Sequence, residues 1–413
     1  MFDHQKETVQ RAALVAVDTG DYDTRASLDE LEALARTAGA QTVAKLVQKR
    51  PSYDPATVIG SGRLEELAQL CKNDGADLVV FDCELSPAQM RNIEDACGTA
   101  VIDRTALILD IFAQRAVTAE GKLQVELAQL KYRLPRLGGM GNVLSRLGGG
   151  IGTRGPGETQ LETDRRHIRR RIAALQEQLA ELKKRRGLLR ARRKKEGVTT
   201  VAIVGYTNVG KSTLLNALTG AGVLAEDKLF ATLDPTSRAL TLPDGRSVML
   251  IDTVGLVRRL PHQLVEAFQS TLEEAANADL LWCVCDAASG ETAEQLDVTR
   301  RLMEELGAQD IPMLVILNKC DLIAEAPRAL NDQTALVSAR TGFGFEALLE
   351  KTARMLAPTH RRVTLLLPYD KTGLISEIMA SGKVYSQVYE AEGTRVDALV
   401  DVRIFHKVAE WCE

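Results

Sequence analysis

A glycine-rich stretch, GYTNVGKS at 205–212, has the residue types and spacing that hold a chain of phosphates. It fits the pattern GxxxxGKS, in which backbone N–H groups wrap phosphate oxygens and a following helix adds the positive end of its dipole. Lys211 can reach the β- and γ-phosphates, and the Ser212 hydroxyl can ligate Mg²⁺. The predicted nucleotide-contacting residues of this P-loop are Gly205, Tyr206, Thr207, Asn208, Val209, Gly210, Lys211 and Ser212.

A second motif, DTVG, follows at 252–255 and consists of Asp252, Thr253, Val254 and Gly255. The Asp252 carboxylate is expected near Mg²⁺, and the Gly255 N–H near the γ-phosphate. We therefore expect Lys211 and Gly255 to act directly on the phosphate that is transferred.

A third motif predicts which base the site selects, and consists of Asn318, Lys319, Cys320 and Asp321. The Asp321 carboxylate can accept from both N1–H and N2–H₂ of guanine, whereas adenine offers neither donor there. The Lys319 side chain can lie against the base. A backbone donor for guanine O6 is expected from the group Ser338, Ala339 and Arg340. The order of the motifs predicts a site for GTP and GDP.

The segment LFATLDPTSR at 229–238 lies where a switch must bring a threonine to Mg²⁺ and the γ-phosphate. By chemistry alone, Thr232 and Thr236 both qualify. The nucleotide contacts predicted for this segment are Phe230, Ala231, Thr232, Leu233 and Asp234.

One catalytic part is missing from these motifs. Ras-like enzymes orient the attacking water with a glutamine after the DxxG motif, and Leu256 stands there instead. Arg258 and Arg259 follow, and we expect them to be solvated or to face a partner rather than to form an internal arginine finger. Slow intrinsic hydrolysis, stimulated by a partner, is the natural inference.

The elements around these motifs predict a parallel α/β sheet. Apolar strands are expected at 199–205, 248–251 and 313–317, each ending at a motif, with a helix at 213–219 after the P-loop. We assign residues 197–358 to a P-loop GTPase domain. A small α+β domain is expected at 359–413, with strands at 363–367 and 395–402 and a helix at 373–381.

Residues 1–104 predict a second parallel α/β domain. Strands are expected at 12–18, 42–47, 78–82 and 100–103, alternating with helices at 27–37 and 63–73 and a third that Ser86 caps with Pro87 in its first position. For the first helix, Ser27 is the predicted N-cap and Glu30 completes a capping box. Gly60-Ser61-Gly62 precedes a helix and could receive a phosphate, although a helix-starting turn explains it as well.

Residues 105–196 predict a long antiparallel helical hairpin. Apolar residues repeat at coiled-coil spacing in two seams, Leu123, Leu127, Leu130, Leu134 and then Ile168, Ile172, Leu175, Leu179, Leu182. Between the seams, the tip loop at 137–157 is too rich in glycine to hold a helix. From Arg165 to Lys195 there are fourteen Lys or Arg and two acids. This basic rod predicts contact with a polyanion.

Composition limits the class of protein. A net charge of −4, 26% charged residues and no apolar run of membrane-spanning length predict a cytoplasmic protein without stable membrane insertion. The seven cysteines lack metal-ligand spacing, and Cys283 and Cys285, two apart on a predicted strand, are expected to be buried thiols. The helical seams can pair within one chain, so a monomer is expected.

The motifs resemble the HflX family of translation-linked GTPases over nearly the whole chain. The resemblance is carried by GSGRLEEL at 60–67, LSPAQMRNIE at 85–94, VIDRTALILDIFAQRA at 101–116, GKLQVELAQLKYRL at 121–134, GGIGTRGPGETQLETDRR at 149–166 and LFATLDPT at 229–236. It implies that Thr232, with Ser212, ligates Mg²⁺. Asn208 resembles the residue that holds K⁺ in several related GTPases, although structural capping of the P-loop is an equal alternative.

The resemblance also implies a partner and an activity. The expected partner is the large ribosomal subunit, with the basic hairpin and its tip loop on rRNA near the peptidyl-transferase region. The expected activity is the splitting of idle or stalled ribosomes in the GTP-bound form. Two alternatives stay open: ATP-dependent RNA remodelling through the N-terminal domain, and a regulatory switch that docks on proteins or peripherally on membranes.

Overall fold

The computed structural model of the 413-residue chain describes residues 9–139, 156–220, 229–230, 236–259, 264, 272–323, 331–356 and 360–412. The strands are β1 (Arg11–Asp18), β2 (Gln41–Lys49), β3 (Leu78–Phe81), β4 (Ala100–Asp103), β5 (Thr199–Gly205), β6 (Thr236–Thr241), β7 (Ser247–Asp252), β8 (Leu280–Asp286), β9 (Met313–Asn318), β10 (Thr334–Leu336), β11 (His360–Leu367), β12 (Lys383–Glu390) and β13 (Gly393–Asp401). The helices are α1 (Thr24–Thr37), α2 (Ser61–Asn73), α3 (Pro87–Cys97), α4 (Arg104–Arg115), α5 (Ala119–Arg133), α7 (Pro156–Lys195), α8 (Lys211–Thr219), α10 (Thr292–Glu305), α11 (Phe345–Met355), α12 (Gly373–Ser381) and α13 (Val402–Phe405).

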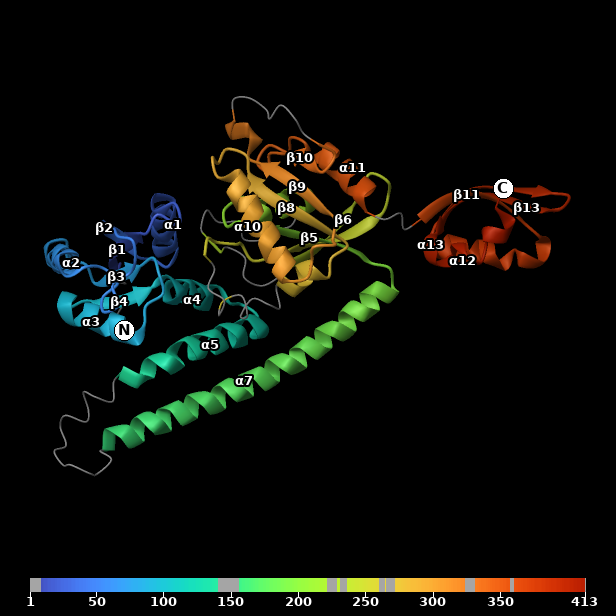
Figure 1. Ribbon diagram of the computed structural model, residues 1–413. Coiled ribbons are helices and arrows are strands. Elements are labelled where there is room, and N and C mark those ends of the chain that lie inside the picture. Colours follow the sequence, from blue (N-terminus) through green and yellow to red (C-terminus); the bar gives the residue numbers. More distant parts are fainter. Residues whose placement is uncertain are drawn as a thin grey trace, which may run out of the picture.

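The N-terminal sheet is parallel and has the strand order β2-β1-β3-β4 (Figure 1). Its central strands are buried on both faces, as a parallel sheet covered by helices requires. Alternate β1 residues point to opposite sides, so Leu14 packs with α1 and α4, and Val15 packs with α2 and α3. The predicted α/β class of this region is confirmed.

The predicted start of α1 is wrong. The helix begins at Thr24, and the Asp23 carboxylate caps it by accepting from the N–H groups of Arg25 and Ala26, both at 3.0 Å. Asp23, four residues upstream of Ser27, is itself a favoured N-cap residue, so the helix starts earlier and Ser27 lies inside it and is buried. In contrast, the predicted Ser86 cap with Pro87 at the start of the helix is confirmed, and Gln89 completes a capping box there that was not predicted.

The two long helices α5 and α7 form the predicted hairpin and lie side by side (Figure 1). Leu175 is fully buried, and the other seam residues of α7 are half-buried. Helix α7 runs for 40 residues, beginning before the predicted start of the seam. Most of the predicted tip loop lies outside the described residues. Among the helices that the structure describes, none combines the length and apolar character needed to cross a membrane.

The central sheet has six strands in the order β10-β9-β8-β5-β7-β6, and only the edge strand β6 is antiparallel to its neighbour. The other pairings are parallel, which places the carboxyl ends of β5, β7, β8 and β9 at one edge. Cys283 and Cys285 are buried thiols on β8, as predicted. This sheet confirms the predicted P-loop architecture and brings the motif loops together at that edge.

The tail is a three-stranded antiparallel sheet, β11-β13-β12, covered on one face by α12 (Figure 1). Two of its strands and α12 match the predicted elements. Strand β12 was not predicted, because its residues are mostly exposed on both sides and show no inside-outside alternation. The domain divisions at 104, 196 and 358 stay predictions.

Candidate functional site

The P-loop is held in shape by close backbone contacts at two glycines. A Cβ at Gly205 would lie 2.2 Å from the carbonyl oxygen of Val284, and one at Gly210 would lie 2.4 Å from Asn318 Nδ2. Both residues also have positive φ, at 144° and 93°. Helix α8 begins directly after Gly210, which makes no side-chain cap bond. No side-chain cap therefore stands between an anion and the N-terminal end of α8, where backbone N–H groups and the helix dipole favour negative charge.

Lys211 is buried at the floor of this loop. Its Nζ donates to the carbonyl oxygens of Gly205 at 3.1 Å and Tyr206 at 2.7 Å. These two bonds fix the ammonium group and leave its third proton for another acceptor. Burial lowers the pKa of Lys211 to about 8, against the opposing effect of the Asp252 carboxylate. A nearby phosphate would favour the charged form.

The predicted magnesium ligands lie beside this lysine. The Ser212 hydroxyl donates to Oδ2 of Asp252 at 2.7 Å, and Asp252 is fully buried at the end of β7. A hydroxyl and a carboxylate oxygen at this separation fit a hard cation such as Mg²⁺, which keeps waters and phosphate oxygens as its other ligands. Thr232, the third predicted contributor, lies outside the described residues with Ala231, Leu233 and Asp234. Thr236, the alternative, is paired in β6 opposite Asp252.

DTVG lies directly on the P-loop. A Cβ at Gly255 would be 2.6 Å from Thr207 Cγ2 and 3.1 Å from Lys211 Nζ, so only glycine fits there. Leu256 N–H donates to the Gly205 carbonyl at 3.0 Å, and its own carbonyl accepts from Thr207 N–H at 2.8 Å. Thr253 and Val254, the middle of the motif, are buried. The Gly255 backbone is thus held next to the predicted phosphate position.

The base-selecting motif is tied to the P-loop by Asn318. Its Nδ2 donates to the Val209 carbonyl at 2.8 Å, and its Oδ1 accepts from Ala339 N–H at 2.9 Å. One side chain therefore fixes three loops relative to one another. Cys320 is half-buried and Arg340 is exposed.

Asp321 presents its carboxylate at the surface, where a base could reach it. The Ser338 hydroxyl donates to Oδ1 of Asp321 at 2.6 Å, which holds the pKa of Asp321 below its ordinary value. The carboxylate is therefore kept ionised as an acceptor. The Lys319 ammonium lies 2.7 Å from Asp286 Oδ2, at the end of β8. This partner was not predicted, because no motif spacing connects Asp286 to Lys319.

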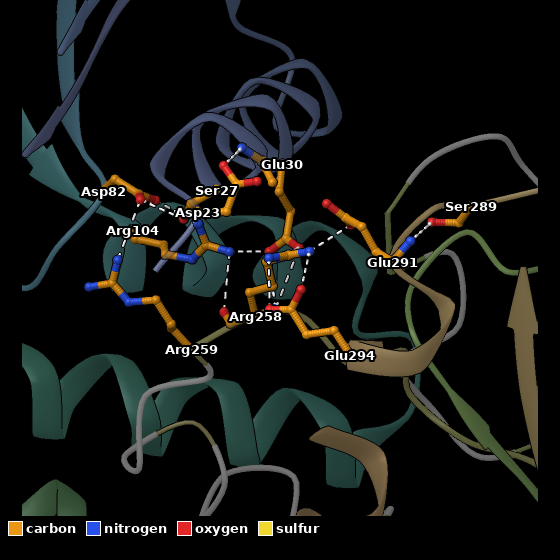
Figure 2. A network of polar contacts seen from close by, with 11 residues as sticks. Asp23, Ser27, Glu30, Asp82, Arg104, Arg258, Arg259, Ser289, Glu291 and Glu294 are labelled. Carbon is orange, nitrogen blue, oxygen red and sulfur yellow. Dashed lines mark hydrogen bonds and ion pairs between the residues drawn. The ribbon is translucent and has the colours of Figure 1, made fainter. Parts of the chain in front are cut away.

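Arg258 is not solvated, which corrects the prediction for that residue, whereas the Arg259 side chain is exposed as expected. The Arg258 side chain is only 10% exposed and its guanidinium contacts Glu291 at 2.6 Å and Glu294 at 3.1 Å (Figure 2). The Arg259 guanidinium stacks on Tyr22, 4.2 Å from the ring centre. Both arginines face acids or aromatic rings of the same chain. These contacts could not be predicted, since the partners come from distant segments.

The described part of the first switch also contacts the N-terminal region. The Phe230 ring packs edge-on against Phe112 of α4, with 4.5 Å between ring centres. Leu229 N–H donates to the Thr37 hydroxyl at 3.3 Å. The side chain of Phe230, a predicted contact residue, is thus buried against α4 of the N-terminal region. Asn208 has a positive φ of 61° and is exposed.

The basic rod is less uniform than predicted. On the half of α7 nearer the central sheet, ion pairs join Lys183 to Glu273 at 2.7 Å, Arg186 to Glu120 at 3.0 Å and Arg190 to Glu274 at 2.9 Å. These acids come from α5 and from the helical segment 272–276, so counting charges along α7 alone missed them. These pairs neutralise part of the positive charge of this half, and its contact with a polyanion stays a prediction.

The other half of α7, nearer the tip loop, keeps its basic surface. Within the described part of the chain, no ion pair involves Arg165, Arg166, Arg169 or Arg170, although Arg171 pairs with Glu126 at 2.7 Å. These four arginines, which we call the distal arginine cluster, are the candidate polyanion contact on this half of the helix.

Gly60 starts α2 as its N-cap, and its N–H donates to Gln48 Oε1 at 2.9 Å. A Cβ there would lie 3.1 Å from Arg50 Nη1. The glycine is therefore explained by a helix-starting turn against β2, and the amide that could have met a phosphate is already bonded.

The chain matches three family models. Residues 25–113 match the model described as "GTP-binding GTPase N-terminal". Residues 115–193 match the model described as "GTP-binding GTPase Middle Region", and residues 200–319 match the model described as "50S ribosome-binding GTPase". Among solved structures, a GTP-binding protein from Sulfolobus solfataricus in complex with GDP is 26% identical with a TM-score of 0.45, covering 84% of this chain and 98% of that one.

Two curated relatives match almost end to end. The chain is 52% identical over 395 residues to GTPase HflX of Caldanaerobacter subterraneus subsp. tengcongensis, covering 96% of this chain and 92% of the relative. It is 42% identical over 417 residues to GTPase HflX of Escherichia coli (strain K12), covering 100% and 96%. With identity of this level over its whole length, the chain belongs to the HflX family of GTPases.

Proposed function

We propose that this GTP hydrolase binds the large ribosomal subunit and, in its GTP-bound form, splits idle or stalled ribosomes into subunits in the cytoplasm. The observation that carries the proposal is the match of residues 200–319 to a 50S ribosome-binding GTPase model, in a chain whose hairpin carries the distal arginine cluster. Four adjacent guanidinium groups that make no ion pair with the described residues suit a phosphate backbone. Because Leu256 stands in place of a water-orienting glutamine, intrinsic hydrolysis is slow, and the ribosome is the partner that stimulates it.

We assign the nucleotide site as follows. Lys211 and the N–H groups at the start of α8 bind the β- and γ-phosphates, and Ser212 with Thr232 ligates Mg²⁺, which neutralises phosphate charge when bound. The support is the short distance from Ser212 to Asp252 and the two carbonyls that orient Lys211. Gly255 gives its N–H to the γ-phosphate. Asp321 takes two donors of guanine.

Loss of the γ-phosphate then removes the contacts of Gly255 and Thr232. While these contacts order the switches, the protein favours its ribosome-bound shape. GTP hydrolysis removes that preference and releases the protein from the ribosome. The hairpin is the part that enters the ribosome. Because α7 is a continuous helix from Pro156 to Lys195, it can carry force from the GTPase domain to the tip.

The test uses the distal arginine cluster with a matched control. The variant Arg169→Gln/Arg170→Gln removes two exposed positive charges from the hairpin. The control Arg300→Gln/Arg301→Gln removes two from an exposed helix of the GTPase domain. Light scattering of purified ribosomes with GTP measures splitting, and co-sedimentation over a range of salt concentrations measures binding.

We expect the hairpin variant to bind ribosomes more weakly, with a salt slope reduced by roughly one to two, and to split them slowly. Its nucleotide affinity should equal that of the control variant, because neither pair lies in the nucleotide site. Normal splitting by the hairpin variant would refute the assigned contact. Binding of ribosomes without any splitting by the unmodified protein would refute the proposed activity but not the contact.

A further inference from the structure

The tail exposes more large apolar side chains than its size suggests. Tyr385, Val388 and Tyr389 on β12 are 48%, 53% and 70% exposed, and Tyr369 nearby is 54% exposed. Tyr369 is anchored to the same strand, because its hydroxyl donates to the Glu390 carbonyl at 2.7 Å. A cluster of exposed aromatic and β-branched side chains on one strand marks an interaction surface.

The backbone of β12 is also open on one side. Strand β12 is an edge strand, and among the described residues no strand pairs with its outer side. The opposite edge of the same sheet, β11, is partly paired, because Cys412 makes an antiparallel β-bridge to Leu365. An edge strand with free N–H and C=O groups can accept another strand.

The sequence of β12, KVYSQVYE, is complementary to itself when read in the antiparallel direction. If two copies pair about a twofold axis between Ser386 and Gln387, the opposite pairs are Lys383 with Glu390, Val384 with Tyr389, Tyr385 with Val388, and Ser386 with Gln387. Each end then joins opposite charges, and each aromatic ring faces a β-branched residue, which are favourable cross-strand pairs. We propose that β12 is a homodimer contact, in which the tails of two copies join their sheets into one six-stranded antiparallel sheet.

Protection of the edge is the competing explanation. A lysine and a bulge often prevent edge pairing, and β12 has a register shift between Val384 and Ser386. The extra residue, Tyr385, lies over the Arg362 guanidinium at 4.9 Å. However, a protective charge would lie inside the strand, whereas the six residues between Lys383 and Glu390 are uncharged. In self-pairing the lysine also meets a glutamate, so it does not oppose the contact.

The size of the contact predicts a weak dimer. Two eight-residue strands bury less surface than a stable interface, which requires more than about 1,000 Å². We therefore expect association at roughly 10–100 µM protein, in exchange with monomer. This replaces the expectation of a monomer at high concentration and does not depend on the proposed ribosome function.

Charge reversal tests the register directly. In a homodimer of K383E, two glutamates oppose each other at both ends, and in a homodimer of E390K two lysines do. We expect each single variant to dimerise at least about tenfold more weakly than the unmodified chain. An equimolar mixture should dimerise again, because each pair then joins a glutamate to a lysine. The double variant K383E/E390K should also dimerise.

Sedimentation velocity of the full chain at several concentrations gives the measurement. The mixture controls for folding: Glu390→Lys loses the pairing of Glu390 with Arg395, but a damaged tail could not recover association on mixing. A protein that stays monomeric up to roughly 100 µM would overturn the proposal. So would a dimer that both single variants form as strongly as the unmodified chain, because its contact would lie elsewhere.

Discussion

Glu30 of α1 contacts Arg258, three residues beyond Gly255, across 228 positions of sequence. The Glu30 carboxylate accepts from the Arg258 N–H at 3.2 Å and lies 3.9 Å from its Nε (Figure 2). Arg104 completes the contact, since it pairs with Glu30 and donates to the Arg258 carbonyl at 3.2 Å. The segment that begins at DTVG, which we call the second switch, is therefore attached to the N-terminal domain through the backbone and the side chain of Arg258.

The first prediction is that Glu30→Gln destabilises the whole chain by about 3 kcal/mol, because two buried guanidinium groups lose a shared charge partner. Urea unfolding measures it. The control is Glu32→Gln on the same helix, which removes an equal charge from a pair with Lys45 whose acid is 44% exposed. We expect the control to cost less than about 1 kcal/mol. Equal losses in the two variants would show that the buried network adds nothing beyond a surface pair.

Sequence motifs predicted the parts of the site that are local. Lys211 and Ser212 stand next to Asp252 as expected, because a P-loop and the strand that ends in DTVG must share one sheet edge. The attachment of Arg258 could not be predicted, since Glu30, Glu291 and Glu294 have no shared spacing and meet only when the domains pack. The same reason hides the pairing of α7 with Glu273 and Glu274. Only folding in three dimensions decides which of the surface charges are neutralised.

A second prediction concerns base choice. Asp321→Asn replaces an acceptor by a mixed amide, so one of the two guanine donors loses its partner. GTP should bind at least about tenfold more weakly, and xanthosine triphosphate should then compete better than GTP. Asp310→Asn, in an exposed turn of the same domain, is the matched control and should bind GTP normally. If Asp321→Asn kept full GTP affinity, the assignment of NKCD as the base-selecting motif would be wrong.

A third prediction follows from the lowered pKa of Lys211, about 8. Bound phosphates need the charged amine, so GTP affinity should fall as the pH rises above about 8, by at most tenfold per pH unit. The stability of the nucleotide-free protein should change in the other direction. Because the unfolded lysine titrates near 10.5, the unfolded state holds more protons between about pH 8 and 10.5, and this group adds stability as pH rises.

Fluorescent-nucleotide titrations between about pH 7 and pH 9 measure this effect. Lys211→Arg is the control, because a guanidinium keeps its charge throughout that range. Its binding, although weaker, should show no such decline. An unmodified protein with constant affinity to about pH 9 would mean that the amine is not the titrating group.

A fourth prediction concerns the missing glutamine at Leu256. We expect K⁺ to stimulate hydrolysis more than Na⁺ at equal ionic strength, with Asn208 as a ligand. Asn208→Ala should then hydrolyse GTP at one rate in both salts, with little change in GDP affinity. The exposed position of Asn208 in the P-loop is compatible with this role. Equal rates of the unmodified protein in the two salts would leave Asn208 as a structural residue of the loop.

The last prediction concerns the half of α7 nearer the central sheet, where acids of other segments neutralise part of the positive charge. Glu273 and Glu274 lie on the segment that follows the second switch, and they pair with Lys183 and Arg190. The variant Glu273→Gln/Glu274→Gln should free these bases, so RNA should bind more tightly at low salt, with a slope steeper by about 0.7–0.9 for each new phosphate contact.

The control for that variant is Glu304→Gln/Glu305→Gln, which removes two adjacent exposed acids from α10 and raises the net charge equally. Filter binding of a ribosomal RNA fragment over a salt series compares the two. If only net charge mattered, the two variants would behave alike, and the ion pairs along α7 would have no effect on RNA. A steeper salt dependence of RNA binding in the Glu273/Glu274 variant alone would mean that this segment shields the half of α7 nearer the central sheet. RNA contact in the unmodified protein would then be confined to the distal arginine cluster and the tip.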